Sequence, residues 1–186
     1  MTDILSTGAW NTARQSAYRY DKGLANALKH FLKEKTVIDF GCGAGGYVAN
    51  LDQVAESRGY DGNPLTAEIS HGRCETLDLS VPVQVPPADG VLCLEVAEHL
   101  PQQFEDTLLS NLDRHAGQGI ILSWAHPGQR GVGHVNEQPA EYVQGRMIDL
   151  AYEWDRESSQ LIRSACRFSW FKTNLMVFRK RHQRDE

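Results

Sequence analysis

The chain has 186 residues, enough for one domain with a substantial buried core but short for a two-domain dehydrogenase. Its formal charge is −5 at pH 7, so no overall positive field attracts nucleic acid or an acidic membrane surface. The four cysteines include no C-x-x-C pair, and no segment has the character of a signal peptide or a transmembrane helix. These features predict a soluble, cytoplasmic protein without membrane or nucleic-acid partners.

Predicted helices and strands alternate along the chain. Apolar spacing and proline or glycine punctuation predict helices over 12–33, 47–51, 101–115, 139–152 and 156–166. Strands are expected at 36–40, just before residue 60, and at 90–94, 119–124 and 169–179. Segments 1–11, 65–80 and 126–138 are expected to be irregular. This alternation predicts an α/β fold of three layers, Rossmann-like, in which a mostly parallel sheet carries helices on both faces. We expect a helical lid segment over 1–35 and the main domain over 36–186, packed as a single domain.

A glycine-rich turn follows the first predicted strand. Asp39 near the strand end precedes Gly41, Gly43, Gly45 and Gly46. Glycines let the backbone turn sharply and approach a ligand without an intervening Cβ. The helix that follows offers free N–H groups to an anionic group. The turn therefore predicts a cradle for a nucleotide-type cofactor; a tight strand-to-helix turn without a ligand is the alternative.

Two classes of cofactor use such a cradle. Gly41, Gly43 and Gly46 satisfy the G-x-G-x-x-G spacing of dinucleotide-binding folds, which leaves a nicotinamide-dependent reductase open. Asp39 instead favours a ligand with an ammonium or sulfonium group and repels a pyrophosphate. The D-x-G-x-G-x-G run resembles the first motif of class I S-adenosylmethionine-dependent methyltransferases. No Tyr-x-x-x-Lys pair follows the strands predicted over 90–94 and 119–124, which argues against the reductase.

The resemblance continues at later strand ends. Asp61 ends the second strand, where a carboxylate can accept both hydroxyls of a ribose or can bind its own backbone in a turn. Asn63 is a possible second ribose partner. The resemblance implies that Asp78 receives the adenine amino group and that the next backbone amide, that of Leu79, meets the ring.

Leu94 and Glu95 lie at the end of the strand predicted over 90–94, and the resemblance implies that they line the methionine part of the donor. Arg19 or Tyr20, from the N-terminal helix, could close over its carboxylate. The expected reaction is methyl transfer to a nucleophile, held close to and in line with the donor. The alternative is a non-catalytic domain that binds the adenosyl ligand as a sensor.

An E-x-x-E-H segment follows this strand, formed by Glu95, Glu98 and His99. Together with the later His134 it resembles two metal-assisted groups: the ubiquinone-biosynthesis O-methyltransferases and the enzymes that methylate the terminal 2′-hydroxyl of small RNAs. The resemblance implies that these four side chains hold Mg²⁺ or Mn²⁺, which would polarise the acceptor hydroxyl. Without a metal, His99, His134 and His126 are candidates for a general base, or are polar loop residues.

The acceptor is expected to be a small molecule that is methylated on oxygen. No Asn/Asp-Pro-Pro-Tyr tetrad follows the strand predicted over 90–94, which argues against amino-directed methylation of nucleic-acid bases. The segment 124–134 is expected to form a wall of the acceptor pocket, with Trp170, Phe171 and Tyr142 as further walls or as core residues. Little sequence lies beyond the core fold, which favours a small acceptor over a folded macromolecule.

Overall fold

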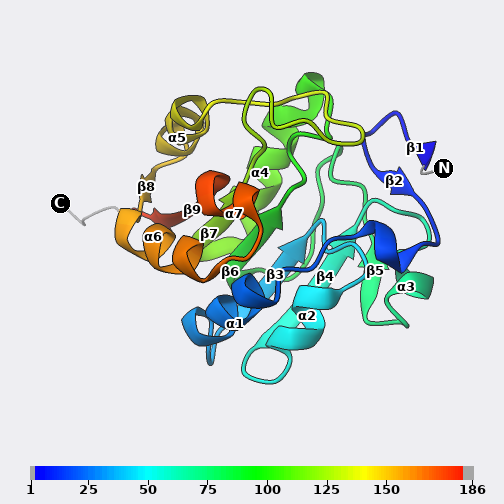
Figure 1. Cartoon of the computed structure of the whole chain (residues 1–186), viewed down its shortest axis with the longest axis horizontal. Helices are drawn as coiled ribbons and strands as arrows, with labels where there is room; N and C mark the ends of the chain where they lie inside the picture. The colour runs from blue at the N-terminus through cyan, green and yellow to red at the C-terminus, as the bar shows by residue number, and fades with distance from the viewer. Residues whose placement is uncertain (1–2, 182–186) are drawn as a thin grey trace.

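The structure, a computed structural model, describes residues 3–181, and helices and strands alternate along it (Figure 1). Its helices are the 3₁₀ turns η1 (Gln15–Ala17) and η2 (Gln102–Phe104) and the α-helices α1 (Lys22–Phe31), α2 (Gly46–Leu51), α3 (Thr66–Ile69), α4 (Glu105–His115), α5 (Ala140–Asp149), α6 (Arg156–Ala165) and α7 (Ser169–Asn174). Its strands are β1 (Asp3–Ile4), β2 (Trp10–Asn11), β3 (Thr36–Phe40), β4 (Glu56–Asp61), β5 (Cys74–Thr76), β6 (Ala88–Leu94), β7 (Ala116–Ser123), β8 (Tyr152–Trp154) and β9 (Leu175–Lys180).

Seven strands form one sheet in the order β5-β4-β3-β6-β7-β9-β8. The first five of these pair in parallel, and β9 runs antiparallel to both β7 and β8. The central strand β3 is almost wholly buried and carries the β-branched residues Thr36, Val37 and Ile38. Because parallel strands end at the same edge, the residues after β3, β4 and β6 lie at one edge of the sheet. The predicted mostly parallel sheet is confirmed.

Helices cover both faces of the sheet, as predicted (Figure 1). One buried cluster joins the sheet to α1, α2, α6 and α7, through residues such as Leu24 and Leu28. A second cluster joins the opposite face to α4 and α5, through Leu108, Leu112 and Met147. Each fully buried aliphatic side chain contributes about 1.5–3 kcal/mol. Within residues 3–181, no helix combines the length and the apolar character that spanning a bilayer requires.

The N-terminal segment differs from the helix predicted over 12–33. Helix α1 begins only after Asp21, whose Oδ1 accepts hydrogen bonds from the N–H groups of Gly23 and Leu24. Before it, η1 and an extended stretch pass over the glycine-rich turn, with the Tyr18 ring against Gly43. The expected helical lid is therefore mostly a non-helical arm. Residues 1–2 and 182–186 of the two predicted parts lie outside the described residues.

Short strands are the other differences. Strands β1 and β2 pair with each other inside the segment expected to be irregular, and α3 and β5 lie within 65–80. The strand predicted over 169–179 begins as α7 and becomes β9 only at Leu175. Strand β8, placed by the prediction at the end of a helix, pairs with β9. Strands of two or three residues are too short to show a periodic pattern, and β5 and β8 also depend on pairing with other strands of the sheet.

Candidate functional site

A cavity of about 920 Å³ opens where β3, β4 and β6 end. This volume is at the upper end of the range typical of small-molecule sites, about 300–1,000 Å³. Its walls come from the glycine-rich turn, the N-terminal arm, the segment 129–134 and α7. The predicted donor-binding residues that line it are Arg19, Tyr20, Asp39, Gly41, Gly43, Gly45, Asp61, Asp78, Leu79, Leu94 and Glu95.

Asp39 is buried at the end of β3 and lines the cavity. Its Oδ2 has no hydrogen-bond partner among residues 3–181. Burial and, secondarily, the neighbouring Asp61 raise the pKa of Asp39 to about 7. A buried carboxylate oxygen without a partner is costly, and a cationic ligand in the cavity would compensate that cost. The residues present therefore fit a ligand with a positive charge at this position.

Asp61, at the end of β4, links the turn that follows it to the glycine-rich turn. Its Oδ2 accepts from Gly43 N at 2.8 Å and its Oδ1 from Asn63 N at 2.8 Å. Burial raises the pKa of Asp61, and these two bonds oppose that rise. Each oxygen keeps a further acceptor site, so the turn role and ribose binding are compatible.

Asn63 lies outside the cavity, which corrects its predicted place beside the ribose. Its side chain is fully buried, and Nδ2 donates to Thr12 O and Tyr18 Oη, each at 2.8 Å. The amide therefore holds the N-terminal arm over the site. Asp78 does face the cavity, with Oδ1 accepting from Ser80 N at 2.9 Å.

Glu95 follows β6 in the left-handed region, with φ 56°. Its Oε1 accepts from Ser123 Oγ at 2.9 Å and from Asn174 Nδ2 at 2.8 Å, and its Oε2 from Gln129 Nε2 at 3.0 Å. The carboxylate thus joins β7, α7 and the loop after β7. These three donors occupy much of its accepting capacity, and Glu95 does not fall within the group that could hold a metal. The sequence prediction missed Ser123, Gln129 and Asn174, because no local motif marks them.

Glu98, His99 and His134 form a compact cluster beside the cavity. Each offers a ligand atom, and these atoms lie within 4.8 Å of one another. Glu98 is fully buried, and within the described part of the chain neither carboxylate oxygen has a hydrogen-bond partner. Burial and, to a lesser degree, Glu95 raise the pKa of Glu98. The two imidazole rings pack edge to face, with centroids 4.9 Å apart. Three of the four predicted metal ligands therefore meet, and their chemistry fits a divalent cation.

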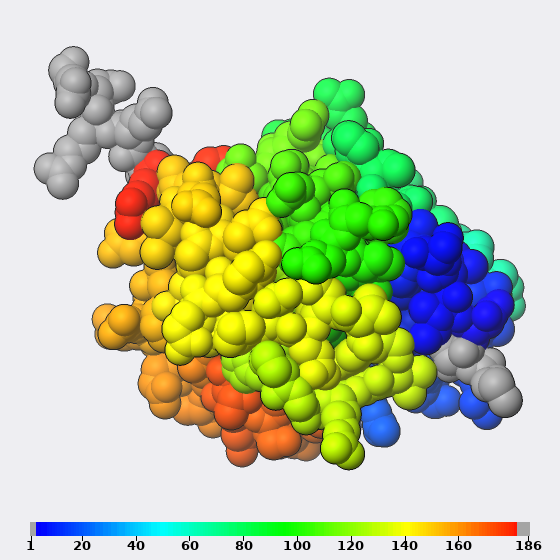
Figure 2. Space-filling model, turned by 90° about the horizontal axis from the view of Figure 1, so that it is seen from above, coloured from blue at the N-terminus to red at the C-terminus, as the bar shows by residue number. Residues whose placement is uncertain are grey.

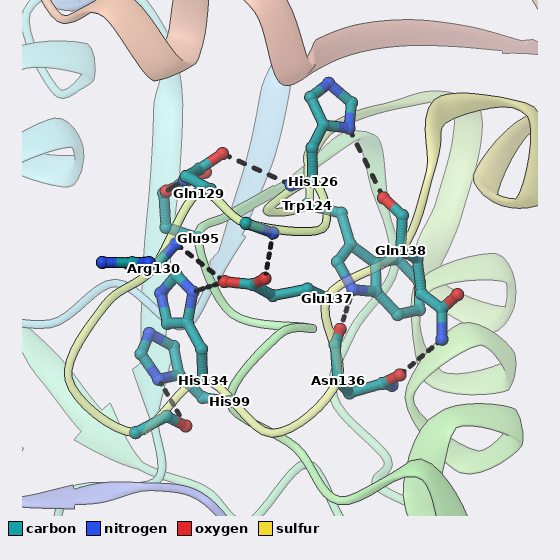
Figure 3. Close-up of polar contacts among 12 residues, drawn as sticks. Glu95, His99, Trp124, His126, Gln129, Arg130, His134, Asn136, Glu137 and Gln138 are labelled. Atoms are coloured by element: carbon teal, nitrogen blue, oxygen red, sulfur yellow. Dashed lines mark hydrogen bonds and ion pairs between the residues drawn. The ribbon is translucent and has the colours of Figure 1, made fainter.

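The two clustered histidines each have a fixed neighbour at Nδ1 (Figure 3). His99 Nδ1 lies 3.3 Å from Gly133 O, and His134 Nδ1 lies 2.9 Å from Glu137 Oε1. Burial lowers the pKa of His99 to about 4. His126 lies apart, with Nδ1 3.4 Å from Gln138 O, and does not line the cavity. Its predicted catalytic role is corrected accordingly.

The N-terminal hairpin and the loop after β7 form one wall together. Figure 2 shows the N-terminal residues in blue beside yellow-green residues of that loop. A Cβ on Gly8 would meet His99 O at 2.0 Å, and one on Gly133 would meet Ile4 Cδ1 at 2.5 Å. Trp170 and Phe171 line the cavity, whereas Tyr142 donates instead to Glu105.

The fold is that of the class I S-adenosylmethionine-dependent methyltransferases, as comparison with solved structures shows. Magnesium protoporphyrin IX methyltransferase (ChlM) from Synechocystis PCC 6803, with bound S-adenosylmethionine, is 17% identical with a TM-score of 0.63, over 91% of this chain and 80% of that chain. The N-methyltransferase NodS from Bradyrhizobium japonicum WM9, in complex with S-adenosyl-L-homocysteine, is 16% identical with a TM-score of 0.65, over 92% and 89%.

A third similar structure is the sugar N-methyltransferase KedS8 from Streptoalloteichus sp ATCC 53650, at 13% identity and a TM-score of 0.67, over 87% of this chain and 88% of that chain. No protein-family model matches the sequence, and no curated protein matches it. At these identities the likeness concerns the fold. The finer resemblance to metal-assisted O-methyltransferases stays a prediction.

Proposed function

We propose that this protein binds S-adenosylmethionine and transfers its methyl group to an oxygen of a small hydroxylated molecule. The observation that carries the proposal is Asp39: a buried carboxylate with an unpartnered oxygen, facing a cavity at the tip of the central strand. A dinucleotide would bring a pyrophosphate toward this carboxylate, whereas S-adenosylmethionine brings a cationic end. Neighbours of the same fold are crystallised with S-adenosylmethionine or its product, which supports the choice of donor.

Residues at different strand ends would bind different parts of the donor. Asp39 would bind the positively charged methionine end, and Asp61 the ribose hydroxyls through its remaining acceptor sites. Asp78, with the Leu79 amide beside it, would bind the adenine. Arg19 or Tyr20 on the N-terminal arm would meet the methionine carboxylate. The methyl group is already activated by the sulfonium, so holding the reactants in line supplies most of the acceleration, about 7–11 kcal/mol.

The cluster of Glu98, His99 and His134 would handle the acceptor's proton. A hydroxyl must lose its proton to become a competent nucleophile, and the cluster holds two imidazoles and an unpaired carboxylate next to the cavity. The same three residues would hold Mg²⁺ or Mn²⁺, which supplies Lewis-acid polarisation of the hydroxyl when bound. The known neighbours include sugar and porphyrin methyltransferases, which supports a small acceptor.

Calorimetric titration with S-adenosylhomocysteine and with NADH tests the donor. We expect the first to bind and the second not to bind. The Asp61→Ala variant should lose a few kcal/mol of affinity, because it removes charge-assisted hydrogen bonds. Binding of NADH in place of the adenosyl compound would overturn the proposal. Methyl transfer from labelled donor to a panel of sugars and phenols then tests turnover, and binding without any transfer would favour the sensor.

Titration of the protein with Mn²⁺, followed by electron paramagnetic resonance, tests the cation. We expect binding in the wild type, with loss in Glu98→Gln and no change in Glu153→Gln, an exposed glutamate on β8. A chelator should then stop turnover, and Mg²⁺ or Mn²⁺ should restore it. Absence of Mn²⁺ binding together with indifference to chelation would leave the histidines as general bases.

A further inference from the structure

We propose that Glu137 is a positioning residue that holds His134 as the tautomer protonated on Nδ1, leaving a free lone pair on Nε2. The inference rests on the proposed function insofar as that function gives His134 a chemical task. No sequence motif indicates a role for Glu137. Its carboxylate lies within the loop after β7, between the strand end and the clustered histidines (Figure 3).

Glu137 is held so firmly that its oxygens can act only as acceptors toward the ring. Oε2 accepts from Gly128 N at 2.7 Å, and Oε1 accepts from Arg130 N at 2.9 Å. Two backbone N–H groups that donate to a carboxyl group stabilise its ionised form, in which both oxygens are acceptors only. His134 Nδ1 lies 2.9 Å from the same Oε1. The ring must therefore place its proton on Nδ1.

His99 is oriented in the same way by the same loop. Its Nδ1 lies 3.3 Å from Gly133 O, and a carbonyl oxygen can only accept. Gly133 precedes His134 directly and Glu137 follows it by three positions, so one short segment orients both rings. Histidines that act as bases or as metal ligands are typically fixed through the opposite ring nitrogen in this manner. Two free Nε2 lone pairs beside the unpartnered Glu98 carboxylate are the result.

Glu137 could also serve only to stabilise its loop, and a glutamine substitution separates that role from an effect on the His134 tautomer. Arg130 has a positive φ of 59°, which is unfavourable for a residue other than glycine, so the hydrogen bond from its N–H to Glu137 also stabilises a strained point in the loop. Glutamine keeps the side-chain length and one acceptor oxygen for the backbone, but its amide can donate as well as accept. Glu137→Gln therefore preserves much of the loop tie while removing the preference for a proton on Nδ1.

Nitrogen-15 NMR of histidine-labelled protein, without donor or acceptor, reads the tautomer directly. Spectra are taken at about pH 8, where an ordinary histidine is neutral. His134→Gln assigns the resonances among the seven histidines. We expect Nδ1 protonated and Nε2 unprotonated in the wild type and in Glu153→Gln, and a mixture of both tautomers in Glu137→Gln. Protonated Nε2 in the wild type, or an unchanged tautomer in Glu137→Gln, would overturn the inference.

Kinetics separate positioning from binding. With an acceptor found in the panel, Glu137→Gln should lower kcat about 10–100-fold while the Kd for S-adenosylhomocysteine stays unchanged. An unchanged kcat would also overturn the inference. If the wild type bound no adenosyl compound, only the proposed function would fail, because the tautomer is measured on the protein alone.

Discussion

The two sides of the cavity are built in different ways. On the proposed donor side, Asp39 and Asp61 lie at the ends of the adjacent parallel strands β3 and β4. On the acceptor side, the wall combines the N-terminal hairpin, the segment after β6, the loop after β7 and α7. Neighbouring strand ends place most of the first side, with hydrogen bonds from Asp61 and Asn63 joining the glycine-rich turn and the N-terminal arm to it. The second side depends on side-chain hydrogen bonds between several segments that are distant in sequence.

The hydrogen bonds of the acceptor side span long stretches of sequence. Asn174 in α7 donates to Glu95, and Trp124 Nε1 donates to Asn136 O at 2.6 Å. The N–H groups of Val135 and Asn136 donate to Glu98 O at 2.9 and 3.0 Å. Such a wall can vary with the acceptor while the strand tips stay constant, because loops tolerate change and strands of the core do not. Substitutions on the two sides should therefore have separable effects.

The largest separable effect is expected from His134→Gln. It removes the ring nitrogen from the cluster beside the cavity, and loss of general acid–base catalysis costs about 10²–10⁴-fold in rate. Donor affinity should not change, since His134 contacts none of the strand tips proposed for the donor. Transfer of labelled methyl groups and calorimetry measure the two quantities. His126→Gln, in the same loop but outside the cluster, should keep most of the turnover; an equal loss in both variants would mean a general loop effect.

On the donor side, Asp39→Asn is expected to lower the affinity for the donor. Charge-assisted hydrogen bonds contribute about 1.5–3 kcal/mol, so donor affinity should fall about 10–100-fold. Folding stability should not fall, because the variant replaces a buried carboxylate, whose Oδ2 lacks a partner in the structure described for residues 3–181, by a neutral amide that costs less to bury. Calorimetry and thermal unfolding test both points. Asp149→Asn, exposed on α5, is the control, and an unchanged donor affinity for Asp39→Asn would remove Asp39 from the site.

The affinity for the donor is also expected to depend on pH, through the protonation of Asp39. Burial raises the pKa of Asp39 to about 7, and only the ionised carboxylate attracts a cation. Affinity should therefore be constant well above that pKa, fall by up to about tenfold per pH unit below it, and level off once the total loss reaches that of Asp39→Asn. Calorimetry at several pH values measures the slope, which should vanish in Asp39→Asn. A slope that persists in the variant would assign the titration to another group.

Cavity-lining residues could be predicted from the sequence where they lie directly at the end of a strand. The glycine-rich turn, Asp61 and Asp78 are local in sequence, and each lines the cavity as predicted. Asn63 and His126 have the right residue types near the right strands, but their side chains turn to Thr12 and Gln138. Only tertiary contacts decide such directions. Glu137 was missed for the same reason, since its meaning lies in which ring it contacts.

Tertiary contacts also limited the prediction of helices and strands. Amphipathic helices and buried parallel strands carry their own periodicity, and the predicted alternation was correct. A helix does lie within the range predicted over 12–33, but its predicted start was wrong, because the Asp21 side chain caps α1 and starts it later in the chain. Strand β8 was missed because it owes its conformation to pairing with β9.

The smallest effect is expected from Ile4→Ala. This variant measures most directly how independent the two sides of the cavity are. Ile4 is 37% exposed and packs on Gly133, so truncation should cost about 1 kcal/mol or less of unfolding free energy. Hydrogen exchange at the Val135 and Asn136 amides should nevertheless speed up, because the hairpin supports the loop that holds them. Val81→Ala, at an exposed residue between β5 and β6, should change the exchange of neither amide. Donor affinity should stay at the wild-type value; a fall in parallel with the exchange would mean that the acceptor wall and the strand tips act as one unit.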